Sequence, residues 1–168
     1  MSRWFVDLSN GPRNLMITLP RVGKYHQHYV RRLGWFTCLD RWHECPFCVH
    51  MNNRRFHRRT KYYFESVDLD QNPNIPQILL LDHYSGDTLI QTFVKKSVHE
   101  LLPEIVGIPF TITRDKRQVI VEKLDRSVSH INLSSLVHYE WDHVCRPRPQ
   151  EYIQKLIDGE LAVEPKVG

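Results

Sequence analysis

The sequence predicts a mainly β protein. Short runs of β-forming residues alternate with turn-forming residues, two pairs of runs have hairpin spacing, and only two short segments have a helical pattern. At 168 residues the chain is long enough for one domain with its own core. A hydrophobic fraction of 41% and a charged fraction of 25% are ordinary for a globular protein.

The first predicted strands flank a cysteine-rich segment. Residues 13–19 nearly alternate between apolar and polar side chains and end at Pro20. Residues 60–70 are rich in aromatic and β-branched side chains and end in a turn. On this second strand Tyr62 and Phe64 share a face with polar groups, so we expect that face to be partly solvated.

Two hairpins are predicted next. The first joins residues 77–83 to 88–94 through a turn that contains Gly86, whose backbone is permissive. The second joins residues 109–113 to 118–124 through a polar turn.

Two helices complete the prediction. Residues 97–100 form a capping box that opens a short central helix, which Pro103 interrupts. Residues 150–158 form a helix that ends at Gly159, and its apolar stripe is expected to be a docking face.

This pattern fits a small Greek-key barrel such as an OB-fold with a metal-binding insertion. We expect an OB-fold domain over residues 1–148, with the insertion at about 26–57. Residues 149–168 would form the C-terminal helix and a weakly acidic tail.

Three cysteines within eleven residues predict a metal site. Cys45 and Cys48 form a Cys-x-x-Cys pair, and Cys38 precedes them by seven residues. Thiolates bind Zn²⁺ tightly, and such a pair can occupy one side of a tetrahedron within a single turn. Pro46 restricts that turn. We therefore expect one structural zinc ion.

A closed zinc site needs a fourth ligand. His28 is favoured, because nine residues before Cys38 allow a strand and a turn to bring the two together. His26, His43 and His50 remain alternatives. The distant Cys145 is expected to be a buried structural residue.

Enzymatic alternatives have less support. A dithiol oxidoreductase would place Cys45 after a buried strand, and the residues before it do not form one; Cys38 would also have no role. Three thiolates and a histidine leave no position for a catalytic water. The sequence therefore predicts a protein that is not an enzyme.

The positive charge is concentrated around the cysteines. Between Arg21 and Tyr62 there are ten Lys or Arg and two acidic residues, whereas the whole chain has a net charge of +4. Aromatic residues lie between these cations, as in surfaces that hold phosphates and stacked bases. The predicted nucleic-acid contacts are Arg31, Arg32, Trp35, Arg54, Arg55, Arg58, Arg59, Lys61, Tyr62, Tyr63, Phe64, Phe93, Lys95 and Lys96. For the aromatic residues, and for Tyr63 above all, a place in the core is the alternative.

The order of these residues resembles a known family. His28, the stretch Gly34-Trp35-Phe36-Thr37-Cys38, the Cys45–Cys48 pair and the stretch Arg59-Thr60-Lys61-Tyr62-Tyr63 are similar to the core of tailed-phage single-stranded DNA-binding proteins. The resemblance covers residues 25–124 and implies a zinc-containing OB-fold that binds single-stranded DNA in replication, recombination or repair. It implies His28, Cys38, Cys45 and Cys48 as zinc ligands, and Arg59, Lys61, Tyr62 and Tyr63 as DNA contacts.

The chain departs from that family at its C-terminus. The family often ends in a long acidic tail, whereas residues 149–168 hold four acidic and two basic residues.

The alternative function is a zinc-ribbon module that binds protein or RNA. Partners would be single-stranded DNA, with RNA as an option, and replication or recombination proteins. With no membrane-spanning run and no secretory signal, we expect a cytoplasmic protein, in the host cytoplasm if it is viral.

Overall fold

The computed structural model describes residues 5–50, 56–94 and 101–162. Within these ranges seven strands form one sheet in the order β3-β2-β4-β1-β6-β7, and β5 pairs with β4. The ladders β1–β4, β1–β6, β2–β3, β4–β5 and β6–β7 are antiparallel. The mainly β prediction is confirmed. No ladder among the described residues closes the sheet, so the barrel closure expected of an OB-fold is not seen.

The chain divides into two compact units. Unit 1 combines the residues up to 24 with residues 61–140, and unit 2 combines residues 25–60 with residues from 141 onward. The metal-binding segment and the C-terminal helix thus belong to one unit, although the sequence pattern predicted them in separate regions. None of the helices that the structure describes is long and apolar enough to cross a bilayer.

Five strands contribute to unit 1. They are β1 (Arg13–Ile17), the second half of β4 (Phe56–Asp68), β5 (Asn72–Asp82), β6 (Pro109–Asp115) and β7 (Gln118–Lys123). β1 lies between β4 and β6, and the predicted hairpin β6–β7 is confirmed. The two short 3-10 helices of this unit are η1 (Pro103–Ile105) and η2 (Leu133–Ser135). The predicted capping box at residues 97–100 lies outside the described residues.

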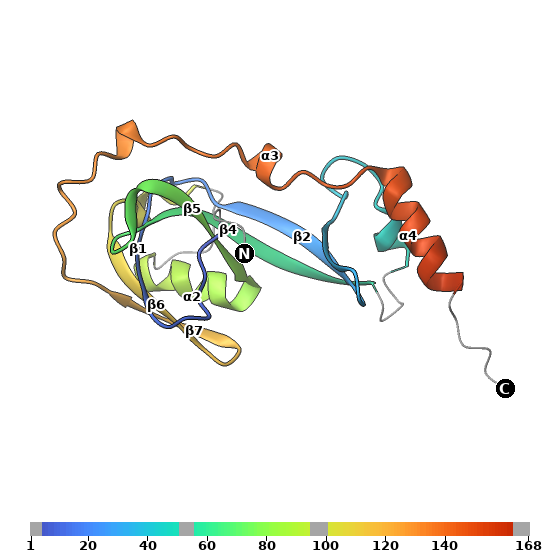
Figure 1. Ribbon diagram of the computed structural model, residues 1–168, viewed down its shortest axis with the longest axis horizontal. Helices are drawn as coiled ribbons and strands as arrows, with labels where there is room; N and C mark the ends of the chain where they lie inside the picture. The colour runs from blue at the N-terminus through green and yellow to red at the C-terminus, as the bar shows by residue number, and fades with distance from the viewer. Residues whose placement is uncertain (1–4, 51–55, 95–100, 163–168) are drawn as a thin grey trace. The chain divides into compact units, whose positions relative to one another are not determined.

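The other predicted hairpin is wrong. After β5 the chain forms helix α2 (His83–Phe93), which packs against β7 (Figure 1). Asp82 caps this helix by accepting a hydrogen bond from the Ser85 amide at 2.9 Å. Leu89 and Ile90 are buried on its inner face. A short apolar run fits both a strand and a helix, and here the cap and the core decide for the helix.

Gly86 shows how closely α2 approaches the sheet. A Cβ at this position would lie 2.8 Å from Tyr62 Cγ and closer still to Tyr62 Cδ2. Alanine normally stabilises a helix interior by about 1 kcal/mol relative to glycine, but overpacking a core costs about 1–3 kcal/mol. We therefore expect Gly86→Ala to lower the free energy of unfolding, measured by urea denaturation.

Gly159 in α4 provides the matched control. A Cβ there would have no neighbour within 4 Å, so Gly159→Ala should stabilise the protein by about 0.5–1 kcal/mol. If both substitutions stabilised the protein equally, the close packing of α2 on Tyr62 would be contradicted.

Both faces of β4 are covered within unit 1. Tyr62 and Phe64 point toward α2 and belong to the main core. On the other face Val67 packs in a second cluster with Ile131, which comes from the irregular segment 124–140. β4 is therefore buried from residue 62 onward, which its alternating sequence did not indicate.

A buried carboxylate fastens segment 124–140 to β4. Glu65 is fully buried and accepts hydrogen bonds from Thr18 Oγ1 at 2.6 Å, His138 Nδ1 at 2.7 Å and the Tyr139 amide at 2.8 Å. Three donors to one buried charge leave no oxygen of this carboxylate unsatisfied. The segment is thus held by a polar clamp as well as by apolar packing.

Glu65→Ala tests this clamp. Hydrogen bonds to a charged group contribute about 1.5–3 kcal/mol each, so losing three should lower the free energy of unfolding by at least about 3 kcal/mol. Protease sites in segment 124–140 should also become accessible. Glu140→Ala, which alters an exposed carboxylate at the end of the same segment, is the control. A loss below about 1 kcal/mol for Glu65→Ala would contradict the clamp.

Unit 2 is built around a small core of its own. Its elements are β2 (Gly23–Val30) apart from the first two residues, β3 (Gly34–Thr37), α1 (Pro46–Val49), the first residues of β4, α3 (Trp141–Val144) and α4 (Gln150–Ala162). α4 packs on α1 (Figure 1). Ile153 and Ile157 are fully buried in this core. The predicted docking face of α4 is therefore used inside the protein. The helix also continues through Gly159, where the sequence predicted its end.

Candidate metal centre and aromatic surface

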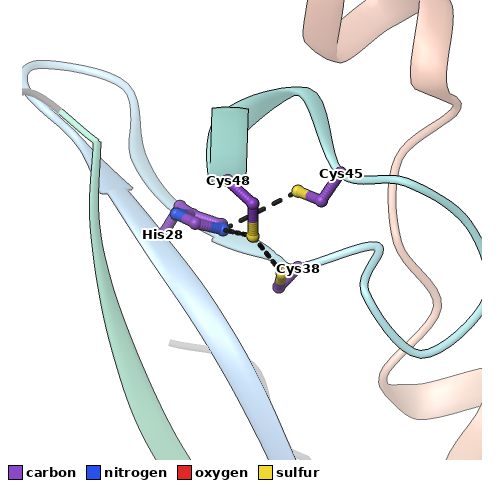
Figure 2. Close-up of side chains that lie close together, drawn as sticks. All are labelled: His28, Cys38, Cys45 and Cys48. Atoms are coloured by element: carbon purple, nitrogen blue, oxygen red, sulfur yellow. Dashed lines mark hydrogen bonds between the residues drawn. The ribbon is translucent and has the colours of Figure 1, made fainter. Parts of the chain in front are cut away.

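Four side chains of unit 2 converge on one point (Figure 2). His28 comes from β2, Cys38 directly follows β3, Cys45 is the N-cap of α1, and Cys48 lies within α1. The Cys48 amide donates to the Cys45 carbonyl at 2.9 Å, and this single turn brings the two sulfurs together. All four potential ligand atoms lie within 4.8 Å of one another.

The spacing of these atoms suits a tetrahedral ion. Cys38 Sγ and Cys48 Sγ are 3.4 Å apart, and His28 Nε2 lies 3.7 Å from Cys45 Sγ and 3.5 Å from Cys48 Sγ. Around a tetrahedral zinc with bonds of about 2.0–2.3 Å, neighbouring ligand atoms are about 3.5–3.8 Å apart. The residues are therefore close enough to hold a metal ion of this size.

The orientation of the His28 ring supports a ligand role. His28 is fully buried, and its Nδ1 donates a hydrogen bond to the Phe56 carbonyl oxygen at 3.0 Å. A carbonyl can only accept, so Nδ1 carries the proton and Nε2 presents its lone pair to the sulfurs. Metal-binding histidines are usually oriented in this way.

The alternative histidines lie in other environments. His26 Nδ1 is 3.1 Å from the Thr60 hydroxyl, and its Nε2 is 3.9 Å from an Asp40 carboxylate oxygen. The ring of His50 packs against Phe56 at 6.1 Å between centroids, and His43 is exposed. Among the described residues only His28 joins the cysteines in the metal-binding cluster.

The three thiols influence one another's ionisation. A hydrogen bond with Cys38 lowers the pKa of Cys45 to about 3, and the same bond raises the pKa of Cys38. Burial raises the pKa of Cys48. One thiolate is thus favoured over three when no cation balances the charge. A divalent cation would bind all three as thiolates and release protons.

A cation and an aromatic core surround the cluster. Arg58 lies 3.9 Å from Cys48 Sγ and forms an ion pair with Asp40 at 3.2 Å, so its charge can offset that of the thiolates. The Phe47 ring contacts the His28 ring at 5.2 Å and the Phe56 ring at 5.5 Å. A metal at this point would join the cysteine turn to β2 and hold the small core of unit 2 together.

The opposite face of the same strands carries exposed aromatic rings. Tyr29 is 43% exposed and Trp35 is 41% exposed, and their rings are 5.1 Å apart. The Arg59 guanidinium lies over the Trp35 ring at 5.6 Å. Because successive side chains alternate across a strand, His28 points to the three cysteines, whereas Tyr29 points to this surface. We call Tyr29, Trp35 and Arg59 the aromatic platform.

The turn between β2 and β3 adds charge to unit 2. Arg31 and Arg32 are both exposed there, and Arg32 has a φ of 70°. Of the other predicted contacts, Arg58 lies beside Cys48 and pairs with Asp40, and Lys61 is half-buried in β4. Arg54, Arg55, Lys95 and Lys96 lie outside the described residues.

Four of the predicted aromatic contacts are buried or half-buried. Tyr62, Tyr63 and Phe64 are buried in β4, which is covered on both faces, so their rings have no open side for a base. Phe93 is half-buried against the main core and packs on Phe110 at 5.6 Å. Base stacking needs an accessible ring face, which Tyr62, Tyr63 and Phe64 lack in this conformation.

Tyr29 was not among the predicted contacts. A signal for it was present in the sequence, because Tyr29 adjoins His28 in a strand and must point away from the metal cluster. The predicted aromatic contacts all follow Gly34, whereas Tyr29 precedes it on β2. The buried position expected for Cys145 is confirmed.

No known protein suggests a function for these residues. Comparison with protein-family models, with curated proteins and with solved structures finds no match for the chain. The cluster of His28, Cys38, Cys45 and Cys48 and the aromatic platform are therefore the features from which a function can be inferred.

Proposed function

We propose that this protein binds single-stranded DNA without sequence preference and uses a structural zinc ion to stabilise the binding unit. The observation that carries the proposal is the aromatic platform. Two neighbouring rings are exposed, and a guanidinium already lies over one of them. Each base that stacks on such a ring contributes about 1–3 kcal/mol without regard to sequence.

The charge of the same unit supports this function. Arg31, Arg32 and Arg59 are exposed on unit 2 and can contact phosphates. Phosphate contacts provide affinity that does not depend on sequence, and they release counterions from the strand. Duplex DNA hides its base faces, so stacking on the platform would favour single strands.

Zinc is the metal that best fits the donor set. Three sulfurs and one imidazole nitrogen in a buried cluster are typical of a structural zinc site, which has no open position for substrate. This fits a binding protein rather than an enzyme. The role of the metal would be to hold the cysteine turn on β2, the strand that presents Tyr29.

The resemblance to tailed-phage single-stranded DNA-binding proteins agrees with this proposal. On that interpretation the open sheet is a variant of an OB-fold, and the protein protects exposed strands during replication, recombination or repair in the cytoplasm. The ligand set implied by the resemblance is the same four residues that converge in unit 2. The implied contacts at Tyr62 and Tyr63 are not proposed again, because both rings are buried.

Salt dependence tests the function directly. Affinity for a labelled single-stranded DNA should fall with a slope of about −2 in log K against log salt, since about three phosphate contacts contribute about −0.7 each. Fluorescence anisotropy with single-stranded DNA, duplex DNA and single-stranded RNA of equal length measures this. A flat slope or equal affinity for duplex would contradict the proposal. Tighter binding to RNA would favour the RNA-binding alternative.

A further inference from the structure

Unit 1 contains a cleft that the aromatic platform does not use. It lies between α2 and the start of β7, with a volume of about 460 Å³. Val119 contributes a buried side chain to its lining, and the other side chains that matter here are Tyr84, Asp87, Gln91, Arg117 and Gln118. All of them belong to unit 1.

The lining combines three kinds of group that recognise a nucleotide. Tyr84 is 79% exposed, so its ring has an accessible face for a base. Arg117 is exposed and can form charge-assisted hydrogen bonds to a phosphate. Gln91 and Gln118 are exposed amides, each with donors and an acceptor for the edge of a base.

The charges of the cleft favour an anion on the side of the β6–β7 turn. Arg117 lies in the β6–β7 turn with Lys116, and Arg114 and Asp115 are the last residues of β6 beside it. On the α2 side of the cleft is Asp87, which accepts a hydrogen bond from the Tyr62 hydroxyl and lies 3.4 Å from His83 Nε2. The phosphate would therefore bind near the turn, and the base would lie along α2.

We propose that this cleft binds one nucleotide, with its base on Tyr84 and its phosphate on Arg117. The nucleotide could be free or part of a longer strand, because both present the same base and phosphate. The site shares no residue with the aromatic platform, so it can be tested separately from the proposed function.

Binding of deoxyadenosine monophosphate to the zinc-loaded full-length protein tests the site. Isothermal titration calorimetry should detect binding at millimolar concentration or tighter, and Tyr84→Ala and Arg117→Ala should each weaken it about tenfold or more. Tyr152→Ala and Arg114→Ala are matched controls. Tyr152 is also an exposed tyrosine, and Arg114 is an arginine next to the cleft that does not line it.

Further titrations show how much the base and the phosphate each contribute to binding. They also show whether the site serves a free nucleotide or a strand. Deoxyadenosine and inorganic phosphate should each bind more weakly than the monophosphate, because each lacks one contact. If a single-stranded oligonucleotide displaces the monophosphate, the site serves a strand; if it does not, the site serves a free nucleotide.

Two results would overturn the proposal. One is no binding of the monophosphate up to about 10 mM. The other is binding that Tyr84→Ala and Arg117→Ala leave unchanged. Trp35→Ala separates this site from the proposed function, because it should weaken oligonucleotide binding and leave monophosphate binding intact.

Discussion

His28→Ala should abolish stoichiometric zinc binding and unfold the small core of unit 2. The substitution removes one of four ligands and also the hydrogen bond to the Phe56 carbonyl. Structural zinc contributes roughly 10 kcal/mol or more to folding, whereas most single side-chain deletions cost below about 5 kcal/mol. Of the changes considered for this protein, this one should have the largest effect. Metal analysis together with thermal unfolding measures it.

His26→Ala is the matched control for this experiment. His26 lies two residues earlier on the same strand face, and its spacing from the cysteines made it an alternative ligand. Its ring contacts Thr60 rather than the sulfurs, so the variant should retain its zinc. A wild-type protein without zinc, or a His28→Ala variant that keeps a full equivalent, would contradict the assignment.

Chelation of the wild-type protein provides a test without mutation. Removing the metal should expose the sulfurs to thiol reagents and lower the unfolding temperature, and added Zn²⁺ should restore both. The cluster is buried except for Cys48, which is half-buried, so the zinc-loaded protein should react slowly. Fast and complete thiol reaction before chelation would argue against a bound metal.

The second large effect is expected at the aromatic platform. Trp35→Ala should weaken single-stranded DNA binding by about 5- to 150-fold, which corresponds to the loss of one stacked base at about 1–3 kcal/mol. Tyr29→Ala should have an effect in the same range. Arg59→Ala should reduce the salt slope by about 0.7, because one phosphate contact is lost. Anisotropy titrations at several salt concentrations measure all three.

Tyr152→Ala controls for the loss of an exposed ring. Tyr152 is 47% exposed, and the Arg148 guanidinium lies 6.0 Å from its ring, so it resembles Trp35 in chemistry. It lies on α4 rather than on the platform, and the variant should bind DNA normally. The Trp35→Ala protein should also keep its zinc and its unfolding temperature. Equal losses for Trp35→Ala and Tyr152→Ala would show that the platform is not the binding surface.

Local chemistry made the candidate metal site predictable from the sequence. Cys45 and Cys48 are linked by one turn, and three soft sulfur donors within eleven residues are a ligand set that zinc prefers. Strand and turn signals likewise located β1 and the β6–β7 hairpin, because their side-chain alternation and turns are encoded within a few residues.

Residues distant in the chain decided the rest. The run after Asp82 became α2 because its inner face packs on Tyr62 and its neighbours, and a local pattern cannot show which partner will cover it. Tyr62 and Phe64 are buried because α2 and segment 124–140 cover β4 on both sides. Alternation indicates which side chains share a face, but only the packed structure shows whether that face meets solvent.

The chain therefore encodes its candidate metal ligands and most of its strands through short-range spacing, while long-range packing selects which aromatic residues stay exposed. Trp35 and Tyr62 are equally good stacking residues by composition. One lies on an open strand face beside Arg59, and the other lies beneath a helix. The physical reason is that burial depends on which elements meet in space, and that depends on the free energy of the whole fold rather than on neighbours in sequence.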